Sequence, residues 1–319
     1  MTHGTGHLGR VPVIVNPAAS GGGGGRLLPG LEERLREKGV EFEVRRTVGP
    51  GHGAELGRQL AREGAPAALV VGGDGTIHEV ANGLLAEGGE AVSTALAVVP
   101  LGTGNDFYRM VGAPSDPESA LDVLLSGVVR RFDVGHVTWE GGSSYFVNLL
   151  GVGIDVEVLR RRAAFKRLTG LAQYLAALPQ ALFSYRSRSM RVTTEEGEVL
   201  EGPITLAAVT VGPSVGGGFL LSPGATPDDG LLDLLFVERI GLLKVARYLP
   251  RVVRGTHGSE DEIHMRQLRS VRIESSDGDE FMFDMDGELG PAATSWLEAR
   301  LVPAALPVLT RPASGGGAG

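Results

Sequence analysis

The sequence predicts a doubly wound α/β domain followed by an antiparallel β-sandwich domain. Up to about residue 131, short apolar segments alternate with segments that have helical spacing, and glycine-rich stretches follow several of the apolar segments. Beyond Phe132, short alternating segments follow one another and are joined by Gly and Asp turns. The first pattern is typical of a parallel sheet with helices on both faces, and the second is typical of a sandwich.

The composition is that of a globular chain whose charge disfavours nucleic acid. The chain has 319 residues, of which 42% are hydrophobic, and this is enough for two domains with cores. It has no cysteine, which excludes disulfides and thiol catalysis, and its net charge of -8 argues against a nucleic-acid partner. Residues 1–7 lack a signal-peptide pattern, and no apolar run approaches the roughly 20 residues of a membrane span. We therefore expect a cytoplasmic protein.

The first domain is expected to span residues 10–131 and to be completed by the apolar residues 301–311. Its predicted strands are 11–15, 40–44, 67–71 and 94–99, and its predicted helices are 27–38, 54–63 and 77–85. The five consecutive glycines at 21–25 predict a loop that is mobile unless a contact orders it. Residues 312–319 are expected to form a disordered tail.

The second domain is expected to span residues 132–300. Its predicted strands are 132–139, 144–149, 190–194, 204–211, 231–237, 271–274 and 280–283. Helices are predicted at 156–183 and 242–254, where they interrupt the strands.

A glycine-rich turn, Gly72-Gly73-Asp74-Gly75-Thr76, joins a buried strand to a helix in the first domain. Glycines let the backbone approach a ligand closely, and the N–H groups at a helix start favour an anion. The turn therefore indicates a phosphate cradle, with an ordinary tight turn as the alternative. The next strand ends in a second glycine-bearing loop at 101–105. Ligands bind at the carboxyl ends of such strands, so the two loops support one another.

Five motifs occur in order along the two domains. They are Asn16-Pro17 with Ser20-Gly21, Gly72–Thr76 with Glu79–Gly83, Pro100–Phe107, Asp229–Asp233, and Asp286–Glu288. Together they resemble the diacylglycerol kinase catalytic family, in particular its bacterial lipid kinases. The resemblance implies an ATP-dependent kinase that phosphorylates a lipid hydroxyl, with a nucleotide-binding α/β domain and a β-sandwich domain.

The resemblance also implies roles for individual residues. Glu288 matches the general base of the bacterial lipid kinases, and Asp74 is either a rival base or a group that orients Mg²⁺. Asp229 matches a carboxylate that binds a structural Mg²⁺ together with the backbone carbonyls of Thr226 and Leu231. The residues that match nucleotide contacts are Asn16, Thr47, Gly72, Gly73, Asp74, Gly75, Thr76 and Thr103. Taken alone, the Asp286–Glu288 and Asp229–Gly230 segments also fit simple turns.

A basic segment at 156–191 predicts contact with an anionic membrane surface. It contains eight Lys and Arg residues and a single acidic residue, Glu157, and apolar and aromatic residues lie between them. Basic amphipathic helices of this kind bind anionic lipid surfaces. The alternative is a helix that packs on its own sandwich and keeps a solvated basic face.

The function that the motifs indicate is a lipid kinase, most directly one that converts diacylglycerol to phosphatidic acid with ATP and Mg²⁺. Sphingosine, ceramide or another lipid is an alternative acceptor. NAD kinases share the Gly-Asp-Gly loop, but the motif at 101–107 favours the lipid kinases. A non-catalytic nucleotide- or lipid-sensing module is a third alternative. The expected location is cytoplasmic with peripheral membrane association, and a homodimer is left open.

Overall fold

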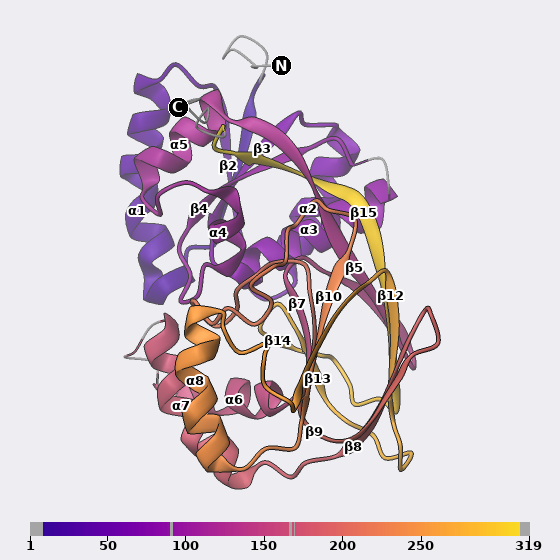
Figure 1. The fold of residues 1–319 in the computed structure, drawn as a ribbon. Coiled ribbons are helices and arrows are strands. Elements are labelled where there is room, and N and C mark those ends of the chain that lie inside the picture. Colours follow the sequence, from indigo (N-terminus) through magenta and orange to yellow (C-terminus); the bar gives the residue numbers. More distant parts are fainter. Residues whose placement is uncertain (1–8, 90–91, 166–167, 169, 313–319) are drawn as a thin grey trace, which may run out of the picture. The chain divides into compact units, whose positions relative to one another are not determined.

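The computed structural model describes residues 9–89, 92–165, 168 and 170–312, which form two compact units (Figure 1). Unit 1 contains the described residues up to Phe132 and those from Ala304 onwards, and unit 2 is Asp133–Pro303. Two long strands, β5 (Val128–Trp139) and β15 (Trp296–Thr310), each have residues in both units. The tail predicted at 312–319 lies outside the described residues from 313 onwards.

Unit 1 is a parallel sheet with helices on both faces. Its strands are β1 (Val11–Val15), β2 (Phe42–Arg46), β3 (Ala67–Gly72) and β4 (Ala95–Pro100), and its helices are α1 (Ala19–Glu37), α2 (His52–Glu63), α3 (Asp74–Gly88), α4 (Asp106–Val111) and α5 (Pro117–Ser126). The strand order is β4-β3-β1-β2, and Val308 of β15 pairs in parallel with Leu96 of β4. Helices α1 and α5 lie on one face, where Lys38 forms a 2.8 Å ion pair with Glu118, and α2 and α3 lie on the other (Figure 1).

The order of the strands creates a ligand-binding position at one edge of this sheet. Every residue of β1, β3 and β4 is buried, as expected for parallel strands covered on both faces. The chain passes from β1 outward to β2 and then returns to β3 on the other side of β1. Such a reversal separates the loops at the carboxyl ends of the two central strands, and ligands bind there.

The loop predicted at 21–25 is instead part of a helix, and a backbone contact orders it. Helix α1 begins at Ala19, has left-handed backbone dihedral angles at residues 20–22, and continues through the remaining glycines to Glu37. A side chain at Gly24 would overlap the carbonyl oxygen of Asn16, so the glycine allows the helix to pack directly on the end of β1. The backbone contact orders a run whose composition alone suggests flexibility.

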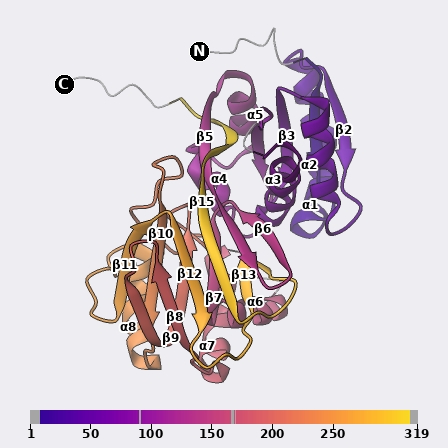
Figure 2. The same cartoon turned by 90° about the vertical axis from the view of Figure 1, so that its right-hand side faces the viewer.

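Unit 2 is a sandwich of antiparallel sheets. Its further strands are β6 (Gly142–Phe146), β7 (Leu149–Gly153), β8 (Ser189–Thr194), β9 (Val199–Thr210), β10 (Leu232–Glu238), β11 (Ile263–Leu268), β12 (Ser270–Ser275), β13 (Phe283–Met285) and β14 (Glu288–Leu289). One sheet has the order β14-β13-β7-β9-β10-β11, and the other contains β9-β8-β12-β15 (Figure 2). Strand β9 belongs to both, because residues up to Pro203 pair with β8 and later residues pair with β7 and β10.

The apolar core of unit 2 has two layers. The first lies between the sheets and includes Trp139, Phe146 and Phe283. The second lies between the β7-β9-β10 sheet and three helices, α6 (Ile154–Arg162), α7 (Gly170–Ser184) and α8 (Leu242–Arg254). The single helix predicted at 156–183 is therefore wrong, because α6 ends at Arg162 and a short 3₁₀ turn (Ala163–Phe165) precedes α7. No helix in the described part of the chain is long and apolar enough to cross a membrane.

Two strand predictions in unit 2 also fail, and one strand was missed. The segment predicted at 144–149 divides between β6 and β7, because a carboxylate from Asp286 takes the N–H groups of Val147 and Asn148 at 2.9 and 2.8 Å. The strand predicted at 280–283 is displaced to β13. Strand β11 was not predicted, because its sequence Ile-His-Met-Arg-Gln-Leu has little apolar alternation.

Candidate active site

The residues predicted to contact a nucleotide all lie at the carboxyl edge of the unit 1 sheet. Asn16 follows β1 directly, Thr47 follows β2, the Gly72–Thr76 turn follows β3, and Thr103 lies in the loop after β4. The N–H of Asn16 donates to Val71 at 3.0 Å. The four loops therefore lie side by side at the edge where the strand order reverses.

Two glycines bring the β3 and β4 loops into direct backbone contact. A Cβ added to Gly73 would lie 2.7 Å from the Cα of Gly102, and a Cβ added to Gly102 would lie 2.7 Å from the Cα of Gly73. Asn105 holds the second loop, because its Oδ1 accepts a hydrogen bond from the Gly102 N–H at 2.7 Å while its own φ is 52°. The result is a backbone surface without side chains, which a phosphate group can approach closely.

Asp74 is the first residue of α3 and ties the two loops together. Its Oδ1 accepts a hydrogen bond from the N–H of Phe107 at 3.1 Å. Thr76, two residues further on, accepts a hydrogen bond from Asn16 Nδ2 at 3.0 Å, and its N–H donates to the Gly73 carbonyl at 2.9 Å. The N–H groups that precede Thr76 in this turn are therefore the ones placed to meet an anion at the helix start.

Glu79 supports the neighbouring loop, a role that its motif did not indicate. Its carboxylate accepts hydrogen bonds from the N–H groups of Gly51 at 2.7 Å and Gly53 at 2.9 Å. These glycines begin α2, so the charge also compensates the positive end of that helix. The sequence did hold one signal for this contact. The 49–53 loop has no acidic or hydroxyl residue that could cap α2, so a side chain from elsewhere had to accept its first N–H groups.

In unit 2, the Asp286–Glu288 segment forms the tight turn between β13 and β14. Asp286 and Gly287 have left-handed φ angles of 52° and 82°. The Asp286 carboxylate accepts hydrogen bonds from three consecutive N–H groups at 2.8–2.9 Å, those of residues 147, 148 and 149. Arg162 of α6 donates to the Gly287 carbonyl at 2.7 Å. These contacts fix the turn and leave the Glu288 side chain exposed.

Two buried carboxyl groups lie behind this turn, and the sequence did not indicate either. Asp155 is near the start of α6 and Asp284 is in β13, and their exposed fractions are only 6% and 1%. Both carboxyl groups converge on Gly151 of β7, where any side chain would overlap them. One oxygen of Asp155 and both oxygens of Asp284 have no conventional hydrogen-bond partner among the described residues. Two acids in such a site are stable only if they retain a proton.

The acid pair predicts a pH-dependent stability. Burial raises the pKa of Asp155 to about 6, and burial together with the charge of Asp155 raises the pKa of Asp284 further. Arg162 lowers the pKa of Asp155, whereas Asp286 raises that of Asp284. An unfolded Asp has a pKa of about 3.9, so above that pH the folded protein holds more protons on this pair than the unfolded chain does. The stability of the folded protein that depends on these protons is therefore fully present below about pH 4. It is lost as the pH rises through about 6 and above, where the pair gives up its protons.

We therefore expect Asp284→Asn to stabilise the protein at pH 8 and to flatten its pH dependence. An amide can donate to Asp155 without adding a charge, and a gain on the order of 1 kcal/mol in the free energy of unfolding is expected. Urea unfolding between pH 4.5 and 8 measures it. Asp277→Asn, in an exposed turn, is the control. A variant whose stability changes with pH as steeply as the parent's would contradict this account.

The turn predicted to bind a structural metal precedes β10. Asp229 Oδ1 accepts a hydrogen bond from the Leu231 N–H at 3.0 Å, and Asp133 Oδ2 accepts from the Gly230 N–H at 2.8 Å. Burial and the nearby charge of Asp229 raise the pKa of Asp233 to about 6. The oxygen-only chemistry of this turn fits a hard cation. No cluster of three or more His, Asp or Glu side chains that could hold a metal occurs among the described residues, so backbone carbonyls would have to complete a site.

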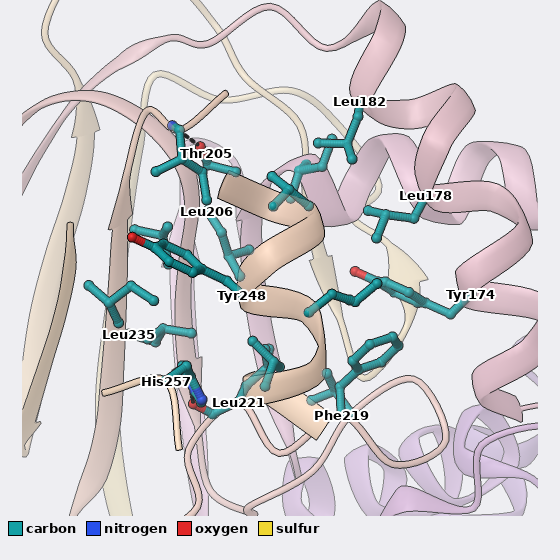
Figure 3. Close-up of a pocket in the computed structure, with 18 residues that line it drawn as sticks. Tyr174, Leu178, Leu182, Thr205, Leu206, Phe219, Leu221, Leu235, Tyr248 and His257 are labelled. Carbon is teal, nitrogen blue, oxygen red and sulfur yellow. Dashed lines mark hydrogen bonds between the residues drawn. The ribbon is translucent and has the colours of Figure 1, made fainter. Parts of the chain in front are cut away.

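Unit 2 also contains an apolar pocket of about 100 Å³ between its sheet and helices α7 and α8 (Figure 3). Tyr174, Leu178 and Leu182 line it from α7, Val245, Tyr248 and Leu249 from α8, and Leu206 and Leu235 from the sheet. The volume is several times what one water requires, and apolar cavities of this kind accept apolar ligands. The sequence did not indicate the pocket, because its lining comes from helices, strands and loops that are far apart in the chain.

Comparison with known proteins agrees with this architecture. Residues 10–137 match the family model of the diacylglycerol kinase catalytic domain, and residues 148–310 match that of the YegS C-terminal NAD kinase beta sandwich-like domain. A probable lipid kinase YegS-like protein of Chromohalobacter salexigens is 34% identical over 88% of each chain. The diacylglycerol kinase of Mycobacterium tuberculosis is 30% identical over 92% of this chain and 96% of its own.

The comparison with solved structures shows that the fold is shared. A diacylglycerol kinase from Bacillus anthracis superimposes with a TM-score of 0.71 over 96% of this chain and 98% of that chain, at 22% identity. The predicted fold class, an α/β domain followed by a β-sandwich, is confirmed. The chain belongs to the diacylglycerol kinase catalytic-domain family and is a lipid kinase.

Proposed function

We propose that this lipid kinase transfers the γ-phosphate of ATP to the hydroxyl group of diacylglycerol and so produces phosphatidic acid. The observation that carries the choice of a lipid acceptor is the apolar pocket of unit 2, which is lined almost entirely by hydrocarbon. Relatives of M. tuberculosis and Bacillus subtilis, each 30% identical to this chain, are named diacylglycerol kinases. Their names support diacylglycerol over the other lipids.

The nucleotide would bind at the carboxyl edge of the unit 1 sheet. The backbone of Gly72, Gly73 and Gly75 would meet the phosphates, because the contact between the β3 and β4 loops keeps side chains away. Asn16, Thr47 and Thr103 stand at the ends of three strands around this turn and would supply side-chain contacts. Thr76 would act through its hydroxyl, since its N–H is bonded to Gly73.

We place Mg²⁺ at two sites in this proposal, one beside the nucleotide and one in unit 2. Asp74 beside bound phosphates would hold or orient the Mg²⁺ that accompanies ATP, and that ion neutralises phosphate charge when it is bound. Asp229, with the carbonyls of Thr226 and Leu231, would hold a structural Mg²⁺ that stiffens the turn before β10. The carboxylates crowded at that turn support the second assignment.

Glu288 is the proposed general base of the transfer. As the lipid oxygen forms its bond to the γ-phosphorus and the bond to ADP breaks, the hydroxyl proton passes to the Glu288 carboxylate. Glu288 is exposed on a turn that Asp286 and Arg162 hold rigidly, so it combines access with a fixed position.

A lipid kinase must reach its substrate at a membrane surface, and we propose a cytoplasmic protein with peripheral membrane contact.

The basic segment 156–191 has fewer arginines available for anionic headgroups than its composition indicates. Five of its arginines have partners: Arg160 and Arg161 with Glu157, Arg162 with Gly287, Arg188 with Asp279, and Arg191 with Glu201. Lys166 and Arg167 lie outside the described residues. Sedimentation measurements on the purified chain would decide whether it forms the homodimer that the sequence left open.

A radiolabelled-phosphate assay over a panel of acceptors tests the proposed reaction. We expect label from [γ-³²P]ATP to enter phosphatidic acid when diacylglycerol is offered, and to enter sphingosine, ceramide and NAD far more slowly. Omission of Mg²⁺ should abolish the transfer. Preferential labelling of another lipid or of NAD would replace the proposed acceptor, and nucleotide binding without any transfer would favour the sensing module.

A further inference from the structure

Large apolar side chains are exposed where helices α7 and α8 enclose the apolar pocket. Phe183, in the last turn of α7, is 88% exposed, and Leu242 and Leu243, in the first turn of α8, are 56% and 89% exposed. Their neighbours Leu182 and Val245 line the pocket. The two helices lie side by side in Figure 1, and both border the pocket in Figure 3. Each exposed side chain is within three residues of one that lines the pocket, and we call the exposed surface of these two helices the rim of the pocket.

Helix α8 has two different faces. Its inner face, Val245, Tyr248, Leu249 and Val252, lines the pocket. Its outer face carries Leu243, Arg247 and Arg254, which recur at helical spacing and are exposed. A helix on a protein surface normally shows a polar outer face, whereas this one begins with two adjacent leucines and continues with cations. That combination is characteristic of helices that lie at a lipid surface.

The charges around this rim are positive and largely uncompensated. Two cations of α8 have acidic partners, because Lys244 pairs with Glu262 and Arg251 pairs with Glu260. Four other cations near the two helices form no ion pair within 4.0 Å with any acidic side chain in the described part of the chain. They are Arg186, just after α7, and Arg239, Arg247 and Arg254, in or next to α8. The whole chain has a net charge of -8, so this local surplus opposes the average. Anionic lipid headgroups are the complementary surface.

We propose that Phe183, Leu242 and Leu243 insert into an anionic bilayer while Arg186, Arg239 and Arg247 contact its headgroups. We call these six residues the rim surface. The apolar side chains enter the hydrocarbon boundary, and the pocket behind them is placed to receive an acyl chain that leaves the bilayer. The proposal deepens the proposed function by naming the surface that meets the lipid, and it rests on that function only for the role of the pocket.

A second copy of the chain is a less suitable occupant. In a symmetric dimer the same patch would face itself, so the unpaired arginines of the two copies would be brought together. Like charges across an interface oppose association. A bilayer that contains anionic lipid presents no such conflict.

Sedimentation with vesicles tests the rim surface on the full chain. The parent protein is expected to sediment with phosphatidylcholine vesicles that contain phosphatidylglycerol, and to bind pure phosphatidylcholine more weakly. Phe183→Ser combined with Leu243→Ser should lower the partition coefficient by about tenfold or more. The matched control is Val199→Ser, because Val199 is a 51% exposed apolar residue of β9 away from these helices. Arg247→Glu should weaken binding to anionic vesicles only, with Arg300→Glu as its control.

Additional measurements separate the possible outcomes. The variants should keep the parent's melting temperature and should phosphorylate lipid dispersed in detergent micelles at the parent's rate, while losing activity on vesicles. Unchanged vesicle binding by folded variants would overturn the proposal, as would a parent dimer that Leu243→Ser dissociates without affecting vesicle binding. If no lipid is phosphorylated in any form but the variants still lose vesicle binding, the proposed function fails and the rim surface stands.

Discussion

Replacing Glu288 with glutamine is expected to lower the turnover number by about 10²- to 10⁴-fold, which is the usual contribution of a general base, the role proposed for Glu288. Glutamine has nearly the same shape as glutamate but cannot accept the hydroxyl proton. Glu288 is exposed in β14, so the substitution should leave the melting temperature unchanged. The Michaelis constant for ATP should also stay close to that of the parent. Steady-state kinetics with diacylglycerol in mixed micelles measure both constants.

The matching controls decide between the two candidate bases. Glu280→Gln removes another exposed carboxylate of unit 2 and should have no kinetic effect. Asp74→Asn should raise the Mg²⁺ concentration needed for activity, because the proposed role of Asp74 is toward the metal that accompanies ATP. If Asp74→Asn instead lowers turnover at saturating Mg²⁺ and Glu288→Gln is nearly as active as the parent, Asp74 is the base and the assignment of Glu288 is wrong.

A methyl group at Gly73 is expected to abolish most nucleotide binding. The Cβ of Gly73→Ala would lie 2.7 Å from the Cα of Gly102, and two backbone segments cannot yield as a flexible side chain can. The φ of Gly73 is -94°, which alanine adopts freely, so the effect is purely one of space. The β3 and β4 loops must separate, and we expect the dissociation constant for an ATP analogue to rise at least about tenfold, with a loss of about 1–3 kcal/mol in stability.

Gly30→Ala provides the matched control for this substitution. Gly30 lies in α1 with no atom within 4 Å of the added Cβ, and alanine is the better helix former by about 1 kcal/mol. This control should bind nucleotide normally and should be slightly more stable than the parent. Calorimetric titration and thermal unfolding of both variants give the comparison. Normal binding by Gly73→Ala would show that the contact between the two loops does not shape the nucleotide site.

The parts of the fold that the sequence predicted best are those in which local pattern and burial agree. Strands β1, β3 and β4 are buried throughout, so each is a continuous apolar run in the sequence. The prediction failed where a contact in the folded chain overrides local preference. The glycines of α1 are ordered by the end of β1, and the break between β6 and β7 is made by Asp286, which is far away in the chain.

The sequence by itself determined the family, the two-domain class and the row of strand-end residues from Asn16 to Thr103, because parallel strands must end at a common edge. Only the tertiary structure decided what surrounds Glu288. Asp155 and Asp284 meet over Gly151, and the pocket and its rim surface gather residues from segments distant in the chain. The burial and the charge of the acid pair, the pocket and the rim surface depend on which distant segments the fold brings together. A local pattern of residues cannot predict which segments these are.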